Sequence, residues 1–445
     1  MPIRSSFDSL PTFSIHPDQF QILHSAQSFR EQLLDAIKNA KQRIYLTALY
    51  LENDEAGREV LSAVYQAKQQ NPNLDIAICV DWHRAQRGLI GADKSQGNAA
   101  FYQDFAQRHE HKVPVYGIPV RNREVFGVLH LKGFIIDDTV IYSGASLNNI
   151  YLHYQERYRF DRYHVITNAS LADSMTDFIR QQMIDHPAVH DLSQTTLPTT
   201  KELRATIKRF RLSLSKTAYQ VRHEALEEGQ IAITPLLGVG KRNNKLNQTI
   251  VQLLASAKSE IYLCTPYFNP PKTVIREVKR AIKRGVKVHI IIGDKTANDF
   301  YIPPEQPFKV IGGLPYLYEI TLRRFARANE SYIRSGDLAI HLWKHDSNSY
   351  HLKGIWIDRQ AMLLTGNNIN PRAWTLDLEN GLFIQDPERQ LEEKFSAEFD
   401  NILTHTRLVE SYRQLESIRH YPVRVKRLLR RVIRTRADRL LKRIL

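Results

Sequence analysis

The sequence predicts an α/β protein made of two duplicated α/β/α halves, each with a central mixed sheet, that share one functional site at their interface. An eight-residue pattern, H-L-K-G followed by three apolar residues and Asp, occurs at 130–137 and again at 351–358. Strand and helix patterns alternate ahead of each copy, and this alternation restarts about halfway along the 445-residue chain. Such alternation is typical of a sheet flanked by helices.

The first half opens with a β–α–β pattern. Residues 29–41 carry apolar side chains at helical spacing, and 43–50 read as an apolar strand. A second helix is expected at 59–69 and a second strand at 74–80. A β–α–β crossover makes the two strands parallel, so we expect a mostly parallel sheet here.

The same pattern restarts near residue 246 as one large internal repeat. Segment 40–46 matches 257–263, an offset of 217 residues, and the two octets are offset by 221. Two related halves are expected to pair about a pseudo-twofold axis, which brings the octets together. The predicted division is a first half at 1–190, a polar linker at 191–200, a second half at 201–405 and a basic tail at 406–445.

Each octet places an imidazole and an ammonium on one side of an extended chain. The octets are predicted to be strands because their apolar runs are β-branched or aromatic. His and Lys stand two residues apart and therefore share a face. Asp137 and Asp358 lie seven residues from their His, roughly 23 Å along a strand, and on the opposite face. We therefore assign both aspartates a structural role at a turn.

A hairpin turn after each octet returns the chain to the His. This brings Asn148 beside His130, and it brings Asn368 and Asn370 beside His351. Lysine is a point charge for phosphate oxygens, and amides donate hydrogen bonds to them. Each repeat is thus expected to form half of a phosphate site.

Two such clusters facing each other place two His on opposite sides of one phosphorus atom. One His can then attack while the other protonates the leaving group. The alternative is a pair of similar surface hairpins left by gene duplication. A single H-x-K would favour that alternative, whereas the doubled octet with a matched polar run after each copy favours the site.

Three carboxylates are candidates to orient the imidazoles. Glu379 precedes the apolar strand 381–384, where it could fix the tautomer of a catalytic His. Its counterpart in the first half is either Glu156 or Asp161, and Asp161 is preferred because it too precedes a strand. An ordinary surface salt bridge is the alternative for all three.

Composition points to anionic partners. The formal net charge of +15 favours phospholipid surfaces, nucleic acid or phosphorylated substrates. Cys79 and Cys264 lie in apolar runs and are expected to be buried free thiols in a reducing cytoplasm. The polar start argues against a signal peptide, and no run approaches ~18 apolar residues, so no spanning helix is expected. No set of Asp, Glu or His with metal-ligand spacing lies near the octets, so neither a cofactor nor a metal is expected.

The tail is the most basic stretch. Residues 423–445 hold ten Lys or Arg against one acidic residue, Asp438. Apolar side chains recur on one face of the expected helix: Val425, Leu428, Leu429, Val432, Leu440, Leu441 and Ile444. Such a basic amphipathic helix is expected to lie on an anionic membrane surface. The alternatives are a helix packed on its own domain and non-specific binding to ribosomes or nucleic acid.

The doubled H-x-K-x₄-D with a polar run after each copy resembles the phospholipase D superfamily. Blocks along the whole chain are similar to one family within it, the phosphatidylserine synthases of Gram-negative bacteria: 80–88, 143–148, 293–303, 315–319 and 365–374. The superfamily's usual Gly-Ser-x-Asn reads Gly-Ala-Ser-Leu-Asn in the first half and Gly-Asn-Asn-Ile-Asn in the second. Which residue near His351 takes the serine role therefore stays open.

The resemblance implies a phosphatidyltransferase with phospholipase D-like halves, CDP-diacylglycerol as donor and L-serine as acceptor. It implies His130 as nucleophile and His351 as general acid and then general base. The phosphate oxygens would be held by side chains from both repeats: Lys132, Lys353, Asn148 and Asn370, supported by Ser146 and Asn368. The residues themselves support phosphodiester exchange at an anionic surface.

The expected location is the cytoplasm, at the inner face of the cytoplasmic membrane, and the oligomeric state stays open. The rival functions are a cardiolipin synthase or a phospholipase D of the same superfamily, and a nuclease or nucleic-acid-binding protein. The blocks outside the octets count against a phospholipase D. The concentration of positive charge in the tail, rather than along a groove, counts against the nucleic-acid class.

Overall fold

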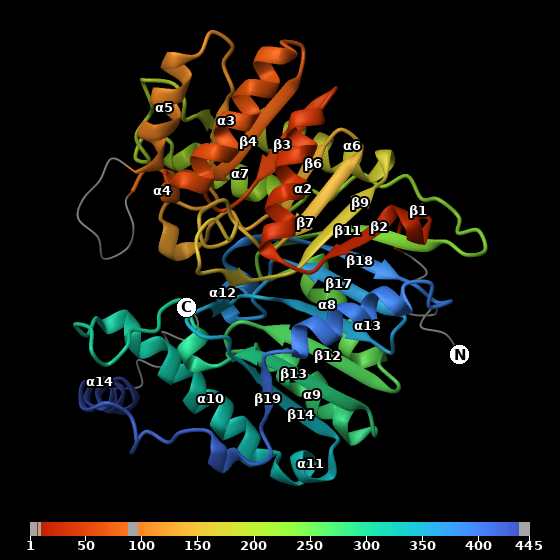
Figure 1. Ribbon diagram of the computed structural model, residues 1–445, viewed down its shortest axis with the longest axis vertical. Helices are drawn as coiled ribbons and strands as arrows, with labels where there is room; N and C mark the ends of the chain where they lie inside the picture. The colour runs from red at the N-terminus through yellow and green to blue at the C-terminus, as the bar shows by residue number, and fades with distance from the viewer. Residues whose placement is uncertain (1–6, 8–9, 88–96, 436–445) are drawn as a thin grey trace.

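Two α/β halves are stacked along the long axis of the molecule, the first above and the second below in Figure 1. The structure, a computed structural model, describes residue 7 and residues 10–87 and 97–435. Each half is built on one mixed sheet, with eight strands in the first and nine in the second.

The first sheet has the order β10-β5-β4-β3-β6-β7-β9-β2. Its strands are β2 (Phe20–Leu23), β3 (Arg43–Thr47), β4 (Asp75–Asp81), β5 (Val115–Ile118), β6 (Gly133–Ile136), β7 (Thr139–Ser143), β9 (Tyr163–Thr167) and β10 (His190–Asp191). β3, β4 and β5 run parallel, and the other neighbours are antiparallel. The predicted parallel β–α–β start is therefore confirmed, within a sheet that is mixed.

The second sheet has the order β1-β11-β18-β17-β16-β12-β13-β14-β19. Its strands are β1 (Phe13–Ile15), β11 (Ile231–Val239), β12 (Glu260–Thr265), β13 (Lys287–Gly293), β14 (Leu338–Trp343), β16 (Gly354–Ile357), β17 (Ala361–Thr365), β18 (Leu378–Gln385) and β19 (Thr406–Leu408). Apart from β1, each strand has a counterpart at the same place in the first sheet, with the same direction relative to its neighbours. The predicted duplication is confirmed at the level of the fold.

Helices cover both faces of each sheet. In the first half they are α2 (Ala26–Asn39), α3 (Glu55–Gln70), α4 (Trp82–Ala85), α5 (Asn98–Arg108), α6 (Ala169–Asp177) with its π-helical extension η3 (Phe178–Ile184), and α7 (Arg204–Leu214). In the second they are α8 (Lys245–Ser256), α9 (Lys272–Lys283), α10 (Leu314–Ala328), α11 (Glu330–Ser335), α12 (Pro371–Thr375), α13 (Glu392–Leu403) and α14 (Val423–Arg434). The short 3₁₀ helices are η1 (Pro17–Gln19), η2 (Glu124–Phe126), η4 (Lys295–Ala297), η5 (Val310–Gly313) and η6 (Tyr412–Gln414).

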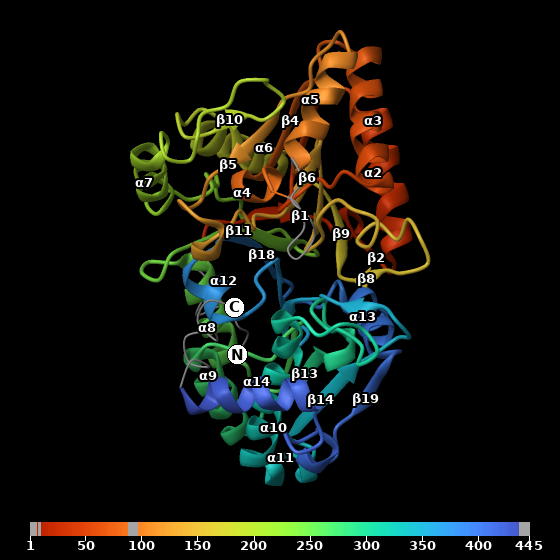
Figure 2. The same cartoon turned by 90° about the vertical axis from the view of Figure 1, so that its left-hand side faces the viewer.

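Strand β6 shows how the layers pack. Phe134 contacts Phe29 of α2, with 5.9 Å between ring centroids. The preceding residue, Gly133, lies on the opposite face, where an added Cβ would come within 2.8 Å of Met175 in α6. α2 is fixed at its start by Ser25, whose side chain accepts a hydrogen bond from the Ser28 amide. Side chains that alternate between two buried faces of the strand, together with local helix capping, thus set the α/β/α arrangement, which Figure 2 shows from the side.

Three details differ from the expected division of the chain. β10, at the start of the expected linker, pairs with β5 in the first sheet. α7, expected in the second half, buries Ile207, Phe210 and Leu214 in the core that contains the first sheet. β1, expected in the first half, pairs with β11 of the second sheet. The physical reason is that strand pairing and the apolar face of a helix decide where a segment packs, whereas the polar composition of residues 191–200 does not. The chain therefore passes from the first half to the second after residue 214.

Cys79 and Cys264 are buried free thiols, as expected. Among the described residues, none of the helices is long and apolar enough to cross a membrane.

Candidate active site

The two halves meet through two short parallel strand contacts. Leu129, just before His130, bridges to Leu378, and the amide of His130 donates to the Leu378 carbonyl at 2.8 Å. On the other side β15 (Ser349–Tyr350) pairs with β8 (Arg159–Phe160), and the amide of His351 donates to the Phe160 carbonyl at 2.8 Å. Each H-x-K segment therefore runs beside the carboxylate-bearing segment of the opposite half.

This register places each carboxylate against the His of the other half. The carboxylate oxygens of Glu379 lie 2.9 and 3.0 Å from Nδ1 of His130. Oδ2 of Asp161 lies 3.1 Å from Nδ1 of His351. All four side chains are at most 8 % exposed. A carboxylate on Nδ1 holds the proton there and turns Nε2 toward the reacting group. Asp161 is thus the counterpart of Glu379, whereas the side chain of Glu156 is exposed.

Both lysines of the octets are buried between the halves. Lys353 lies 3.2 Å from Asp161, and its ammonium group contacts the ring of His351. The backbone of Lys132 exchanges two hydrogen bonds with the side chain of Asn380, at 2.9 and 2.8 Å. Burial, followed by repulsion from Lys353, lowers the pKa of Lys132 to about 7. An anionic substrate would relieve that repulsion and hold both ammonium groups in their charged form.

The imidazoles are set up as neutral groups. Burial, then Lys132, Lys353 and His351, put the pKa of His130 well below its usual value. Burial and Lys353 do the same to His351. Lys353 and His351 of the second repeat lower the pKa of His130, and Lys132 of the first lowers that of His351, so the charges of each repeat act on the imidazole of the other. A neutral imidazole with a free Nε2 is a competent nucleophile or base, and two lysines beside it suit an anionic group.

The motif aspartates lie at the hairpin turns, with positive φ. Asp137 accepts hydrogen bonds from the amides of Lys41, Gln42 and Arg43, at 2.7–3.2 Å. Asp358 does the same in the second half, with the amides of 258–260 at 2.7–2.9 Å. Each therefore fastens the octet hairpin to the start of the central parallel strand.

The octets themselves are only partly strand. Regular pairing begins at Gly133 and at Gly354, so His and Lys lie in the extended segment that precedes β6 or β16. The prediction of a strand over the whole octet was wrong in this respect. The reason is that the segments carrying His leave their own sheet to pair with the opposite half.

The polar runs after the octets lie at the seam, but their amides have local partners. Oδ1 of Asn148 accepts from the Tyr151 amide at 3.1 Å, and Oδ1 of Asn370 accepts from the Ala373 amide at 2.8 Å. Only the amide nitrogen of each could donate to a phosphate. Ser146 is buried, and Asn368 is partly buried with its carbonyl bound by the Thr265 hydroxyl at 2.8 Å.

The two glycines in these runs allow close packing around the site, Gly144 within the first half and Gly366 across the interface between the halves. A Cβ at Gly144 would lie 2.6 Å from a carboxylate oxygen of Asp161, and one at Gly366 would lie 2.7 Å from Cγ of Lys132. A side chain at either position would displace a site residue. The glycines therefore support the compact arrangement that brings Asp161 and Lys132 into the site.

Sequence reasoning missed several side chains around the His. The hydroxyl of Tyr151 lies 2.9 Å from Nδ1 of His351. Arg162 crosses the seam to Glu398, at 2.7 and 2.9 Å, and lies 3.9 Å from the ring of Trp356. His164 is buried, with its Nε2 3.2 Å from a carboxylate oxygen of Glu398. The one sequence signal for these residues is that they lie in a stretch rich in Tyr and Arg that follows the polar run 143–148.

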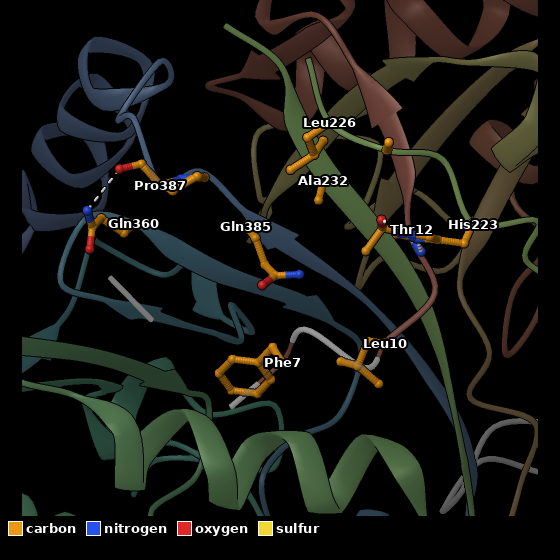
Figure 3. A pocket seen from close by; sticks show the side chains of 10 residues that line it. Phe7, Leu10, Thr12, His223, Leu226, Ala232, Gln360, Gln385 and Pro387 are labelled. Atoms are coloured by element: carbon orange, nitrogen blue, oxygen red, sulfur yellow. Dashed lines mark hydrogen bonds between the residues drawn. The ribbon is translucent and has the colours of Figure 1, made fainter. Parts of the chain in front are cut away.

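In the described part of the chain, no group of three or more His, Cys, Asp or Glu could hold a metal ion. A cavity of about 260 Å³ with a mixed polar and apolar lining lies elsewhere, near β1, β11 and β18 (Figure 3). It contacts β18 at Gln385, six residues or roughly 20 Å of strand from Glu379. The cavity thus holds none of the octet side chains.

Comparisons with known proteins give a consistent result. The family described as "Cardiolipin synthase, PLD-like domain" matches residues 33–182 and 250–403. The chain is 47% identical to the CDP-diacylglycerol–serine O-phosphatidyltransferase of Haemophilus influenzae, over 99% of this chain and 98% of that protein. It is 49% identical to the corresponding enzyme of Escherichia coli K12, over 98% and 96%. The crystal structure of the H. influenzae Rd KW20 phosphatidylserine synthase superposes with a TM-score of 0.96 at 46% identity, covering 100% of this chain and 99% of that one.

Proposed function

The chain belongs to the phosphatidylserine synthase family, and we propose that it exchanges CMP for L-serine on CDP-diacylglycerol through a phosphatidyl-histidine at His130. Its two phospholipase D-like parts, 33–182 and 250–403, each supply one of the two octets. The products are phosphatidylserine and CMP. The enzyme is a phosphatidyltransferase.

In the first step Nε2 of His130 attacks the phosphorus that bears the diacylglycerol. The negative charge of the bound donor raises the pKa of His351, so that its ring is protonated in the complex. The bond from that phosphorus to the CMP oxygen breaks, and His351 passes this proton to the departing CMP and becomes neutral. Lys132 and Lys353 stabilise the charge that builds on the phosphate oxygens, with the amide groups of Asn148 and Asn370 and the adjoining Ser146 and Asn368 in support.

In the second step His351 accepts the proton of the serine hydroxyl, and the serine oxygen attacks the same phosphorus. The P–N bond to His130 breaks, which restores the neutral imidazole. Glu379 steadies His130 through Nδ1 in both steps, and Asp161 does so for His351.

One observation carries this proposal: each His is held at Nδ1 by a buried carboxylate of the opposite half. Two imidazoles oriented in this way, with two buried lysines between them, suit double displacement at one phosphorus. A surface hairpin pair, the alternative from sequence, would not have these groups buried.

The direct test is covalent labelling. The protein is mixed with CDP-diacylglycerol labelled in its diacylglycerol part, quenched without serine, and assayed for label on the chain. We expect His130→Asn to remove the label and His351→Asn to slow its appearance. His24→Asn, which changes an exposed histidine, is the matched control. Unchanged labelling in His130→Asn would overturn the assignment of the nucleophile.

We further propose that the protein works at the inner face of the cytoplasmic membrane and that α14 contacts its anionic lipid. A diacyl substrate stays in a bilayer, so the enzyme must reach the surface. α14 is packed through Val425 and Leu429 against Tyr316 and Leu317 of α10. Its arginines remain exposed, and so does Val423 at 68%. The support is therefore for electrostatic contact, because the predicted apolar face is in part already covered.

Leu440, Leu441 and Ile444 of that predicted face lie outside the described residues. Val310 of η5, 71% exposed, adds an apolar side chain beside α14. An exposed apolar residue next to arginines is typical of a surface that meets lipid head groups.

A further inference from the structure

A group of charged and phenolic side chains extends from His351 toward solvent. Arg159 and Asp299 form an ion pair of 2.9 Å, and both side chains are 14% exposed. Arg159 lies 4.7 Å above the ring of Tyr151, whose hydroxyl reaches His351. The hydroxyl of Tyr267 donates to Asp299 at 2.7 Å, and its ring lies 6.4 Å from that of His351. The ion pair is thus connected to His351 through two tyrosines.

The surroundings of His130 differ at the equivalent place. Arg159 stands two residues before Asp161, and the residue two before Glu379 is Asp377. Asp377 is buried, accepts from the Val128 amide at 2.9 Å and pairs with Arg372 at 3.2 Å. The duplicated framework therefore carries opposite charges at this position. On the His351 side both partners of the ion pair, Arg159 and Asp299, are 14% exposed, whereas on the His130 side the carboxylate of the pair, Asp377, is 6% exposed.

The charges of Arg159 and Asp299 suit an α-amino acid. A zwitterion carries its ammonium and carboxylate on one carbon, so its partners must be an anion and a cation lying side by side. Arg159 offers a fork for a carboxylate, and Asp299 accepts from an ammonium group. Burial alone would raise the pKa of Asp299, but Arg159, His351 and Tyr267 bring it below its usual value, so it is anionic.

We propose that Arg159 and Asp299, supported by Tyr151 and Tyr267, form the acceptor subsite and bind the zwitterion of the amino acid. This inference rests on the proposed function and names the residues that select its acceptor. The ammonium displaces Arg159 from Asp299, and the carboxylate then pairs with Arg159. Each charge exchanges one partner for another, so the ion pair opens without leaving a buried charge unpaired.

The subsite also explains why the hydroxyl reacts. With its two charged groups held on the solvent side, the β-carbon hydroxyl is directed toward His351. His351 takes the hydroxyl proton, the oxygen forms a bond to phosphorus, and the bond from phosphorus to His130 breaks. No further reactant is needed.

The test compares acceptors with and without an ammonium group. Transfer from CDP-diacylglycerol in detergent micelles is measured with L-serine, with 3-hydroxypropanoate and with no acceptor. Asp299→Asn should raise the KM for L-serine roughly tenfold to hundredfold, as expected for loss of a hydrogen-bonded charge. The ratio of kcat/KM for L-serine to that for 3-hydroxypropanoate should be about tenfold or more lower in this variant than in the parent. The reason is that 3-hydroxypropanoate has no ammonium group and so makes no contact that the variant loses.

A structural role for the ion pair would give a different result. Equal losses in Asp299→Asn with both acceptors and in acceptor-free CMP release, or an unchanged KM for L-serine, would overturn the subsite. Tyr267→Phe removes only the hydroxyl that orients Asp299 and should raise the KM for L-serine several-fold. It decides the question if Asp299→Asn does not fold, and an unchanged KM there would also overturn the subsite.

Glu59→Gln is the matched control, because it removes a carboxylate from an ion pair with Arg30 on α2 and α3, outside the site. Its kinetics should match the parent protein. If the parent protein shows serine-dependent transfer and the KM for L-serine is unchanged in both Asp299→Asn and Tyr267→Phe, the subsite is contradicted and the proposed function stands. A parent protein without serine-dependent transfer contradicts the proposed function and the subsite together.

Discussion

At the scale of single residues, the site depends on partners that come from the other half of the chain. His130 is oriented by Glu379 and His351 by Asp161, each at about hydrogen-bonding distance. Both carboxylates are buried beside lysines, and the imidazoles are driven to the neutral form. The chemistry of one repeat is thus incomplete without the other.

Removing the carboxylate from Nδ1 should therefore slow the reaction. We expect Glu379→Gln to lower kcat by roughly a hundredfold or more, since an amide no longer stabilises the imidazolium or fixes one tautomer. Steady-state CMP release gives the rate, and Glu156→Gln, at an exposed carboxylate, is the control. A loss below about threefold would mean that Glu379 does not act through His130.

The pH dependence should follow Lys132. Its pKa is lowered to about 7, so in the free enzyme the ammonium loses its proton above that pH and attracts the anionic donor less strongly. We expect kcat/KM for the donor to fall as pH rises through about 7. His130 must be neutral to attack, and its pKa is well below the usual value, so the acid limb should lie well below pH 6.5. A rate profile that stays flat to about pH 9 would contradict this assignment.

A chelator should leave the reaction intact. In the proposed mechanism, lysine and amide groups hold the phosphate where a metal enzyme would place its ion, and the steps use only histidines and lysines. Initial rates with and without EDTA test this. A strict dependence on Mg²⁺ or Mn²⁺, restored by adding the ion back, would contradict the two-histidine mechanism.

At the scale of elements, the octet hairpins position the site, and α14 presents a basic surface to solvent. Asp137 and Asp358 tie each octet hairpin to a central strand, so the His segments can leave the sheet while the turns stay fixed. α14 packs one face on α10 and leaves its basic side exposed. The packed-helix alternative therefore describes residues 423–434, and in our proposal the exposed charges make the contact with lipid.

Neutralising exposed arginines of α14 should weaken binding to anionic vesicles. Each basic group near an anionic leaflet contributes about 1 kcal/mol, so Arg424, Arg427 and Arg430 changed together to Gln should lower partitioning roughly a hundredfold at low salt. Vesicle sedimentation across salt and acidic-lipid content measures this effect. The control changes the same number of exposed lysines on α9, Lys272, Lys279 and Lys283. Equal binding and an equal salt slope would show that α14 is not the anchor.

At the scale of the whole molecule, a buried ion pair joins the two halves across their interface. Arg162 of the first half is 4% exposed and is held by Glu398 of α13. Gly354 of the second octet makes room for it, since a Cβ there would lie 2.3 Å from the guanidinium. The second octet thus serves the interface as well as the site.

Removing Glu398 should destabilise the pairing of the halves. Glu398→Gln leaves Arg162 buried without its counter-charge, which costs about 3–5 kcal/mol of unfolding free energy. Glu59→Gln, which breaks a partly exposed pair with Arg30, should cost less than about 1 kcal/mol. Urea unfolding of both variants makes the comparison. Similar losses would mean that the crossing ion pair does not hold the halves together.

The sequence by itself determined what is local or repeated. Period-two and period-3.6 patterns located α2, β3, α3 and β4, and the doubled octet predicted two halves with a shared site, because such patterns depend only on which side chains face the core. The turn role of Asp137 followed from parity along a strand. The basic character of the tail follows from its composition alone.

Only the tertiary structure decided that the carboxylate of each half orients the histidine of the other half. The pairing of His130 with Glu379 joins residues 249 apart, and that of His351 with Asp161 joins residues 190 apart. No spacing rule reaches across such separations, since they depend on how two sheets dock. The parallel bridge between Leu129 and Leu378 sets that docking and, with it, the register of the whole site. The same reason hid Arg162, Arg159 and Asp299: each gains its partner only when the halves close on one another.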